Sequence, residues 1–183
     1  MNSISHWLRG FSTGRNTLLG LIVLIIFMVM VLPKQAAQAN ENAGGTGTPD
    51  LSFMYSLDEL YLMAKTYGDD GRSEYVRARF TFDLVWPIVY TFFLVTAISW
   101  LFGKTTPAKS IWQRANLVPL LAMVLDYLEN ISTSIVMVRY PARTAVVDVF
   151  ATVFTPMKWV LVGVSFILLL IGIAFAVWGW KRN

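Results

Sequence analysis

The segment Ala115-Asn-Leu-Val-Pro-Leu-Leu-Ala-Met-Val-Leu-Asp126-Tyr-Leu-Glu129-Asn130 joins a long apolar run to two acids and an amide. Mostly apolar residues continue over 131–138, so the stretch reaches the roughly 20 residues that a bilayer-spanning helix needs. Ionisable side chains inside such a helix are costly to bury and mark candidate functional positions. Asp126, Glu129 and Asn130 are three to four residues apart, which places them on one helical face. The sequence therefore predicts a membrane-spanning helix with one polar face.

The composition places the chain among integral membrane proteins. It has 183 residues, of which 56% are hydrophobic and 14% charged, and its mean hydropathy is +0.56. It contains no cysteine, which excludes disulfides, iron–sulfur clusters and cysteine-ligated zinc. His6 is the single histidine, so we expect no metal and no cofactor. The net charge of +4 comes from basic residues around apolar runs, which favours the lipid bilayer as partner and argues against nucleic acid.

The first part of the chain, residues 1–33, allows two interpretations. A polar tail with Arg9 and Arg15 precedes the apolar run 18–32, and small residues follow around Ala37 and Ala39. This order is typical of a signal peptide cleaved after Ala39. The apolar run is also just long enough to cross a thin bilayer as an uncleaved first helix. We expect the uncleaved helix, so that residues 1–33 form a cytoplasmic tail and the first span.

Residues 34–82 are expected to form a linker and a helical cap outside the membrane. The stretch 40–50 is rich in Asn, Gly and Thr, which predicts a flexible linker. Ser56 followed three residues later by Glu59 forms a capping box and predicts a helix start. Gly68 is a suitable residue for the end of that helix. A second helix is expected from about Ser73.

The remaining residues, 83–183, carry the other three spans. The helix from Ser73 is expected to continue through Asp83 to Phe102, with a kink at Pro87. The third helix should begin at Ile111 or Ala115 and end near Val138. A helical piece over 144–155 should be interrupted at Pro156, before a last span over 159–180. The predicted fold class is all-α: a four-helix transmembrane bundle with an extracytoplasmic helical cap.

Basic residues predict the orientation. The N-terminal tail, the 103–114 loop and the C-terminal end contain Lys and Arg but no acid, and cytoplasmic segments carry such an excess. Both termini are therefore expected in the cytoplasm, with residues 33–82 and 139–156 outside. If the third span enters the hydrocarbon near Ala115, a rise of 1.5 Å per residue puts Asp126 about 17 Å deep and Glu129 about 21 Å deep. Both would lie in the outer half of the membrane.

This depth predicts a buried polar cluster with basic side chains near it. The expected cluster members are Asp83, Tyr90, Asp126, Glu129 and Asn130. The candidate charge partners are Arg72, Arg77, Arg79, Arg139 and Lys158.

Three functions of the cluster compete. Paired charges can simply fix how the helices pack, as in a non-enzymatic accessory or assembly component that binds other membrane protein subunits. Asp126 and Glu129 could instead serve a membrane-embedded pocket or enzyme for a lipid-like small molecule, with at least one carboxyl group kept neutral. Passage of protons or cations is the least favoured, because the cytoplasmic halves of the spans lack ionisable residues. No phosphate loop, nucleophile elbow or metal motif assigns catalytic residues.

Several motifs occur together along the chain: Tyr67-Gly68-x-x-Gly71-Arg72-x-x-Tyr75, Phe82-Asp83-x-x-Trp86-Pro87-x-x-Tyr90, Leu125-Asp126-x-x-Glu129-Asn130, Tyr140-Pro141 and Lys158-Trp159. In this combination the chain from Tyr55 onward is similar to a family of uncharacterised bacterial four-span integral membrane proteins. The resemblance brings no reaction, substrate or partner. It implies a bacterial inner-membrane location and an uncleaved first helix. It also singles out seven polar positions: Arg72, Asp83, Tyr90, Asp126, Glu129, Asn130 and Lys158.

Overall fold

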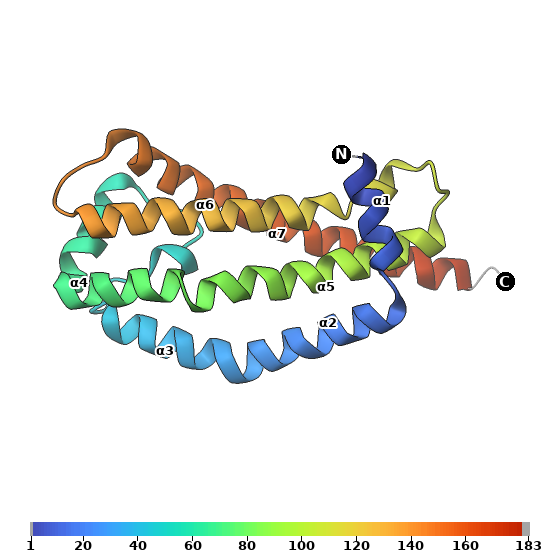
Figure 1. Ribbon diagram of the computed structural model, residues 1–183, viewed down its shortest axis with the longest axis horizontal. Coiled ribbons are helices and arrows are strands. Elements are labelled where there is room, and N and C mark those ends of the chain that lie inside the picture. The colour runs from blue at the N-terminus through green and yellow to red at the C-terminus, as the bar shows by residue number, and fades with distance from the viewer. Residues whose placement is uncertain (1, 181–183) are drawn as a thin grey trace. The chain divides into compact units, whose positions relative to one another are not determined.

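The computed structural model describes residues 2–180, and within this range the chain is helical without any strand. The helices are α1 (Asn2–Phe11), α2 (Gly14–Ile26), α3 (Leu32–Asn42), α4 (Leu57–Arg79), α5 (Phe82–Thr105), α6 (Leu117–Arg139) and α7 (Ala145–Trp180) (Figure 1). Short helical turns, η1 to η3, cover Phe27–Val31, Pro49–Leu51 and Ile111–Arg114. Four stretches are long and apolar enough to cross a membrane: Gly14–Asn42, Leu57–Thr105, Ile111–Arg139 and Ala145–Gly179. The all-helical, four-span prediction is confirmed at this level.

The chain forms two compact units. The first unit consists of Met1–Ile25, Ile88–Met123 and Val160–Asn183, and the second of Ile26–Pro87 and Val124–Trp159. The core of the second unit joins Leu60 and Ala64 of α4 to Val136 and Met137 of α6 and Ala151 of α7. All five are shielded from solvent. In the first unit, Gly172 of α7 faces Leu101 of α5, where an added Cβ would lie 3.1 Å from the Leu101 Cβ.

The first span differs from its expected ends. The polar tail contains a helix, α1, because Ser5 and Leu8 are buried on one face of it. The helix does not stop near Pro33 but continues to Asn42 through η1, a π-helical turn. Pro33 stands in the first turn of α3, directly after η1, and a local π-helical adjustment is one way in which a membrane helix tolerates a proline.

The region before α5 also departs from the prediction. The capping box is confirmed, since the Glu59 N–H donates to Ser56 Oγ at 3.2 Å and the Ser56 N–H donates to Glu59 Oε2 at 2.7 Å. Gly68 interrupts α4 with a left-handed φ of 63°, a conformation that favours glycine. The second part of α4 follows immediately instead of starting near Ser73. It ends at Arg79, and Thr81 Oγ1 beyond this end donates to the Arg77 carbonyl.

Two further expectations were wrong. The stretch 40–50 is no free linker: Ala43, Thr48 and Pro49 are buried. The helix also does not break at Pro156, which lies inside α7. Proline is tolerated in membrane helices because neighbouring groups satisfy the freed backbone carbonyl. The predicted kink at Pro87 concerns a residue that likewise lies inside a continuous helix, α5.

Close packing of α3 on α4 gives a stability prediction. A Cβ on Gly71 would lie 2.8 Å from the Asn42 carbonyl oxygen, so Gly71→Ala should push the two backbones apart. We expect a loss of about 1–3 kcal/mol in the free energy of unfolding, measured as a lower unfolding temperature in detergent. Gly163→Ala is the matched control, since nothing lies within 4 Å of its added Cβ. Equal unfolding temperatures for the two variants would contradict the packing.

Candidate functional site

The buried charges of the second unit centre on one lysine. Lys158 of α7 forms ion pairs with Asp126 and Glu129 of α6, with its Nζ 3.2 Å from Asp126 Oδ1 and in contact with Glu129 Oε2. The exposed fractions of the three side chains are 6%, 11% and 1%. We call these residues the lysine triad. Because one ammonium faces two carboxylates, the triad carries one excess negative charge when all three are ionised.

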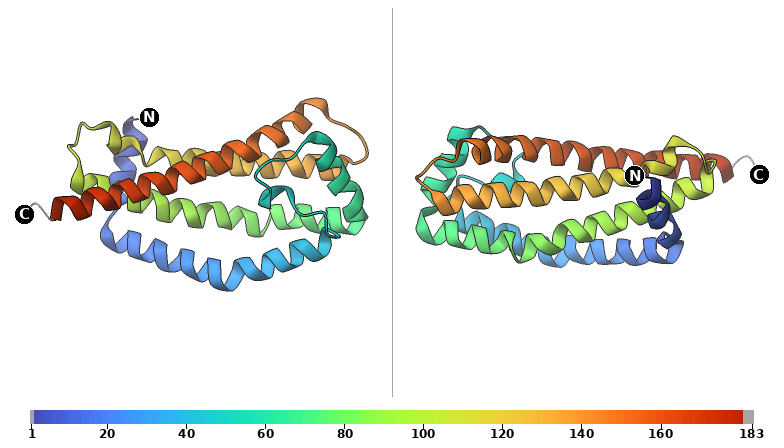
Figure 2. Two further views of the ribbon diagram at one scale, coloured as in Figure 1. Left: turned by 180° about the vertical axis from the view of Figure 1, so that it is seen from behind. Right: turned by 45° about the horizontal axis from the view of Figure 1, so that its top comes forward.

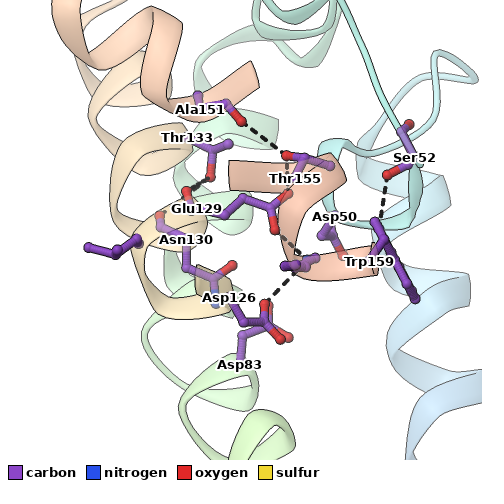
Figure 3. Close-up of polar contacts among 12 residues, drawn as sticks. Asp50, Ser52, Asp83, Asp126, Glu129, Asn130, Thr133, Ala151, Thr155 and Trp159 are labelled. Atoms are coloured by element: carbon purple, nitrogen blue, oxygen red, sulfur yellow. Dashed lines mark hydrogen bonds and ion pairs between the residues drawn. The ribbon is translucent and has the colours of Figure 1, made fainter. Parts of the chain in front are cut away.

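The remaining side-chain oxygen of Glu129 accepts a hydrogen bond from Thr155 (Figure 3). Thr155 Oγ1 donates to Glu129 Oε1 at 2.6 Å. The Tyr55 hydroxyl donates to the Ala151 carbonyl at 3.0 Å and lies 2.9 Å from Thr155 Oγ1. The Thr155 hydroxyl thus donates to a buried carboxylate, which lowers the cost of keeping it charged.

The segment between α3 and α4 completes this site. Tyr55 reaches α7 from that segment, and the Trp159 indole N–H donates to the Ser52 carbonyl at 3.1 Å. Within the second unit the segment lies along the first half of α7 (Figure 2). A stretch with linker composition is therefore ordered by side chains on a membrane-spanning helix.

A second buried cluster, the arginine triad, consists of Arg79, Asp50 and Asp83. Arg79 Nη1 lies 3.1 Å from Asp50 Oδ2 and 2.9 Å from Asp83 Oδ2, and its guanidinium stands 4.5 Å from the centre of the Tyr75 ring. Asp83 and Asp126 approach each other in Figure 3. The two triads thus place four carboxylates and two cations in one part of the second unit.

The electrostatic setting of Asp50 follows from its two cationic neighbours. Burial by itself would raise the pKa of Asp50, but the positive charges of Arg79 and Lys158, with hydrogen bonds from Arg79 and the backbone, hold this pKa below its ordinary value of 3.8. Asp50 therefore stays ionised at neutral pH.

A pocket of about 570 Å³ opens beside the arginine triad. Arg79, Asp50 and Asp83 line it together with Thr48 and residues of α3 and α4. Asp50 Oδ1 and Thr48 Oγ1 are buried without a hydrogen-bond partner among the described residues. Asp126 and Glu129, the residues named for the alternative of a membrane-embedded pocket, do not line this one, and neither does Tyr90.

The structure distributes the predicted site residues unevenly. Asp83, Asp126, Glu129, Arg79 and Lys158 belong to the two triads. Three of the other candidate partners lie elsewhere: Arg72 pairs with Asp69, Arg77 pairs with Glu74 at 3.5 Å, and Arg139 is exposed. Asn130 is buried, and its Nδ2 has no hydrogen-bond partner among residues 2–180. Tyr90 is buried on the part of α5 that belongs to the first unit.

Sequence reasoning missed Asp50, Tyr55 and Thr155. Thr155 lies about one helical turn before Lys158 on α7, so the two side chains share a face of this helix. A helix break was expected at Pro156, between them, and the two residues were therefore not placed together. Asp50 lies at the end of the stretch 40–50, whose composition predicted a linker, and Tyr55 lies just before the capping box. No periodicity identifies either residue.

Each carboxylate of the triads has a cationic partner, and no group of three His, Cys, Asp or Glu able to hold a metal ion occurs in the described part of the chain. Comparison with protein-family models, with curated proteins and with solved structures found no match.

The lysine triad predicts unequal costs for removing its members. Lys158→Met leaves two buried carboxylates without their cation and should cost about 3–5 kcal/mol in the free energy of unfolding. Glu129→Gln keeps the Lys158–Asp126 pair and an acceptor for Thr155, so we expect a loss of less than about 2 kcal/mol. Thermal unfolding in detergent measures both changes. Equal losses would show that the pairing contributes little.

The arginine triad predicts an acid-sensitive contribution to stability. Because the folded pKa of Asp50 is below its ordinary value of 3.8, its stabilisation is complete above about pH 4 and is lost as the pH falls through the folded pKa. Asp50→Asn should therefore lower stability at neutral pH and reduce the dependence of stability on pH below about pH 4. The exposed Asp70→Asn is the control and should leave stability at neutral pH unchanged. A wild-type pH profile for Asp50→Asn would refute the assignment.

Proposed function

We propose that this protein is a non-enzymatic component of a bacterial inner membrane, an accessory or assembly subunit that binds other membrane proteins. The observation that carries the proposal is the pairing of all four triad carboxylates with Arg79 or Lys158. Such a network is weak evidence for net stability but can specify a single packing arrangement. A rigid, chemically inert charge cluster suits a protein that presents a fixed surface.

The proposed topology has both termini in the cytoplasm and residues 34–82 as an outer linker and helical cap. The division of charge supports it. The acid-free segments expected inside, namely the N-terminal tail, the 103–114 loop and the C-terminal end, all belong to the first unit. The segments expected outside belong to the second unit, which contains every Asp and Glu of the sequence. This separation agrees with the positive-inside rule.

Two spans offer surface to other subunits. Only 11% of the apolar window of Gly14–Asn42 and 17% of that of Ala145–Gly179 is buried, against 61% and 50% for the other two spans. The exposed side chains must be covered by lipid or by a neighbouring span. Lipid tails are as apolar as these side chains, so van der Waals packing and hydrogen bonds, not the hydrophobic effect, would hold a partner's helix there.

Co-purification tests the proposal. The protein, tagged at its natural expression level and extracted in a mild detergent, should carry a membrane protein in fixed stoichiometry. Glu129→Gln, which keeps the fold, should retain that partner, whereas Lys158→Met should lose it together with its thermal stability. A strictly monomeric protein without partners, found in several mild detergents, would contradict an accessory role.

A second function is supported by the pocket beside the arginine triad. Its lining includes four acids, Glu41, Asp50, Glu74 and Asp83, against two cations, Arg77 and Arg79. Its volume of about 570 Å³ falls within the usual range for small-molecule sites. The pocket therefore suits a lipid-like small molecule with a cationic group, bound at Asp50 and Asp83 and not at Asp126 and Glu129.

A pair of matched amphiphiles tests this second function. Dodecyltrimethylammonium should raise the unfolding temperature of the protein more than dodecyl maltoside at equal concentration, because only the former supplies a cation to the pocket. Asp50→Asn should remove the difference, and the exposed Asp70→Asn should keep it. An equal response of the wild-type protein to both amphiphiles would exclude a cation-selective pocket.

A further inference from the structure

A second, smaller pocket lies in the first unit and has the opposite charge. Its volume is about 230 Å³, and it is lined by Ser5, His6 and Arg9 of α1, residues 108–110 of the preceding loop, and Gln113 and Arg114 of η3. Lys109 belongs to the loop residues, so three permanent cations face the pocket without any carboxylate in its lining. A cavity with this lining favours an anion.

The lack of acids extends to the whole first unit. Its sequence contains no Asp or Glu, while the part that the structure describes includes five basic residues: Arg9, Arg15, Lys104, Lys109 and Arg114. In the second unit the buried Arg79 and Lys158 are held by carboxylates. The first unit has no carboxylate that could neutralise Arg9, Lys109 or Arg114. An external anion would therefore not have to displace an acidic side chain of this unit.

The pocket is held in place by buried hydrogen bonds. The Ser5 hydroxyl donates to Asn116 Oδ1 at 2.8 Å, and Asn116 Nδ2 donates to Ser99 Oγ at 2.9 Å. Arg9 Nη1 donates to Gln113 Oε1 at 3.0 Å. Gln113 is itself buried and donates to the Phe102 carbonyl at 2.9 Å. Side chains therefore dock α1 on η3 and on the turn that follows it, and these are in turn bound to α5.

One donor of this site lacks an acceptor. Arg9 Nε is buried and has no hydrogen-bond partner among the described residues. An unpaired buried N–H costs free energy that an incoming acceptor oxygen would recover. A phosphate group supplies several such oxygens with negative charge, and arginine matches its geometry well.

Exposed apolar side chains on α1 and η3 point to a membrane source for this phosphate. Ile4, Trp7 and Phe11 recur at helical spacing on α1 and are all exposed, Trp7 to 71%. Ile111 of η3 is 73% exposed. A short helix with basic residues and an exposed apolar stripe containing Trp is typical of a helix lying in the membrane interface.

We infer that the first unit binds the phosphate headgroup of an anionic phospholipid between α1 and the loop before η3. Arg9, Lys109 and Arg114 provide the charge, and Ile4, Trp7 and Ile111 contact the adjoining acyl region. The volume of about 230 Å³ accommodates a headgroup without its acyl chains. This site is independent of the partner and of the pocket proposed above.

Native mass spectrometry of the full chain in detergent, with added lipid, tests the inference. Phosphatidylglycerol should bind more tightly than phosphatidylcholine, whose phosphate is neutralised by its own trimethylammonium group. The triple variant Arg9→Gln/Lys109→Gln/Arg114→Gln should weaken phosphatidylglycerol binding by about 10- to 100-fold, given roughly a tenfold effect or less for each basic residue near a membrane surface. Without lipid the variant should lose only the Arg9–Gln113 hydrogen bond, which costs about 0.5–1.5 kcal/mol, so its unfolding temperature should fall slightly.

The control variant removes the same charge from the second unit. Lys34→Gln/Lys65→Gln/Arg139→Gln alters three exposed residues and should retain wild-type phosphatidylglycerol binding. Equal weakening by both triple variants, or equal wild-type affinity for the two lipids, would overturn the site. Inorganic phosphate is a further probe: complete displacement of the lipid at equal concentration would assign the pocket to a free anion and overturn the lipid assignment.

Discussion

The ion pairs of Lys158 with Asp126 and Glu129 are the constraint on which the second unit depends. Carboxylates in an apolar helix must be neutralised or paired, and within residues 2–180 the one cation that reaches both is Lys158 of α7. This requirement fixes the register of α7 against α6, because a shift by one residue would turn Lys158 away by about 100°. One ammonium cannot balance two carboxylates. The Thr155 hydroxyl, which is also hydrogen-bonded to Tyr55, therefore donates to Glu129 and helps to stabilise its charge.

In the arginine triad, too, one cation pairs with two carboxylates, here from other elements of the second unit. Arg79 at the end of α4 is paired with Asp83 at the start of α5 and with Asp50 of the interhelical segment. The segment between α3 and α4 thus contributes to both clusters, through Asp50 to one and through Tyr55 to the other. Its glycines, three of which have positive φ, permit the turns that bring these side chains back to the helices. Order in this segment arises from the Asp50–Arg79 ion pair, from the hydrogen bonds that Tyr55 and Ser52 make to α7, and from the burial of Ala43, Pro49 and Tyr55.

Sequence reasoning reached the parts that periodicity and hydropathy determine. The four spans, the start of α4 at its capping box and the polar positions of α6 follow from residue spacing alone. The helix ends expected at Pro33 and Pro156 were wrong, because a membrane helix can contain a proline without ending there. Asp50 and Tyr55 could not be placed, because their partners are about 30 and 100 residues away. No local sequence pattern predicts which distant side chain such a residue will bind.

The distribution of charge gives the two units different chemistry. Every acid of the chain lies in the second unit, and there Arg79 and Lys158 are already neutralised by the carboxylates that hold them. The first unit has cations but no acids, and its buried polar contacts are between neutral groups such as Ser5, Asn116 and Gln113. Neutral hydrogen bonds can fix α1 without using up the charge of Lys109 or Arg114. Buried charge therefore holds the second unit together, whereas the first unit keeps its surface charge available to anions from outside the protein.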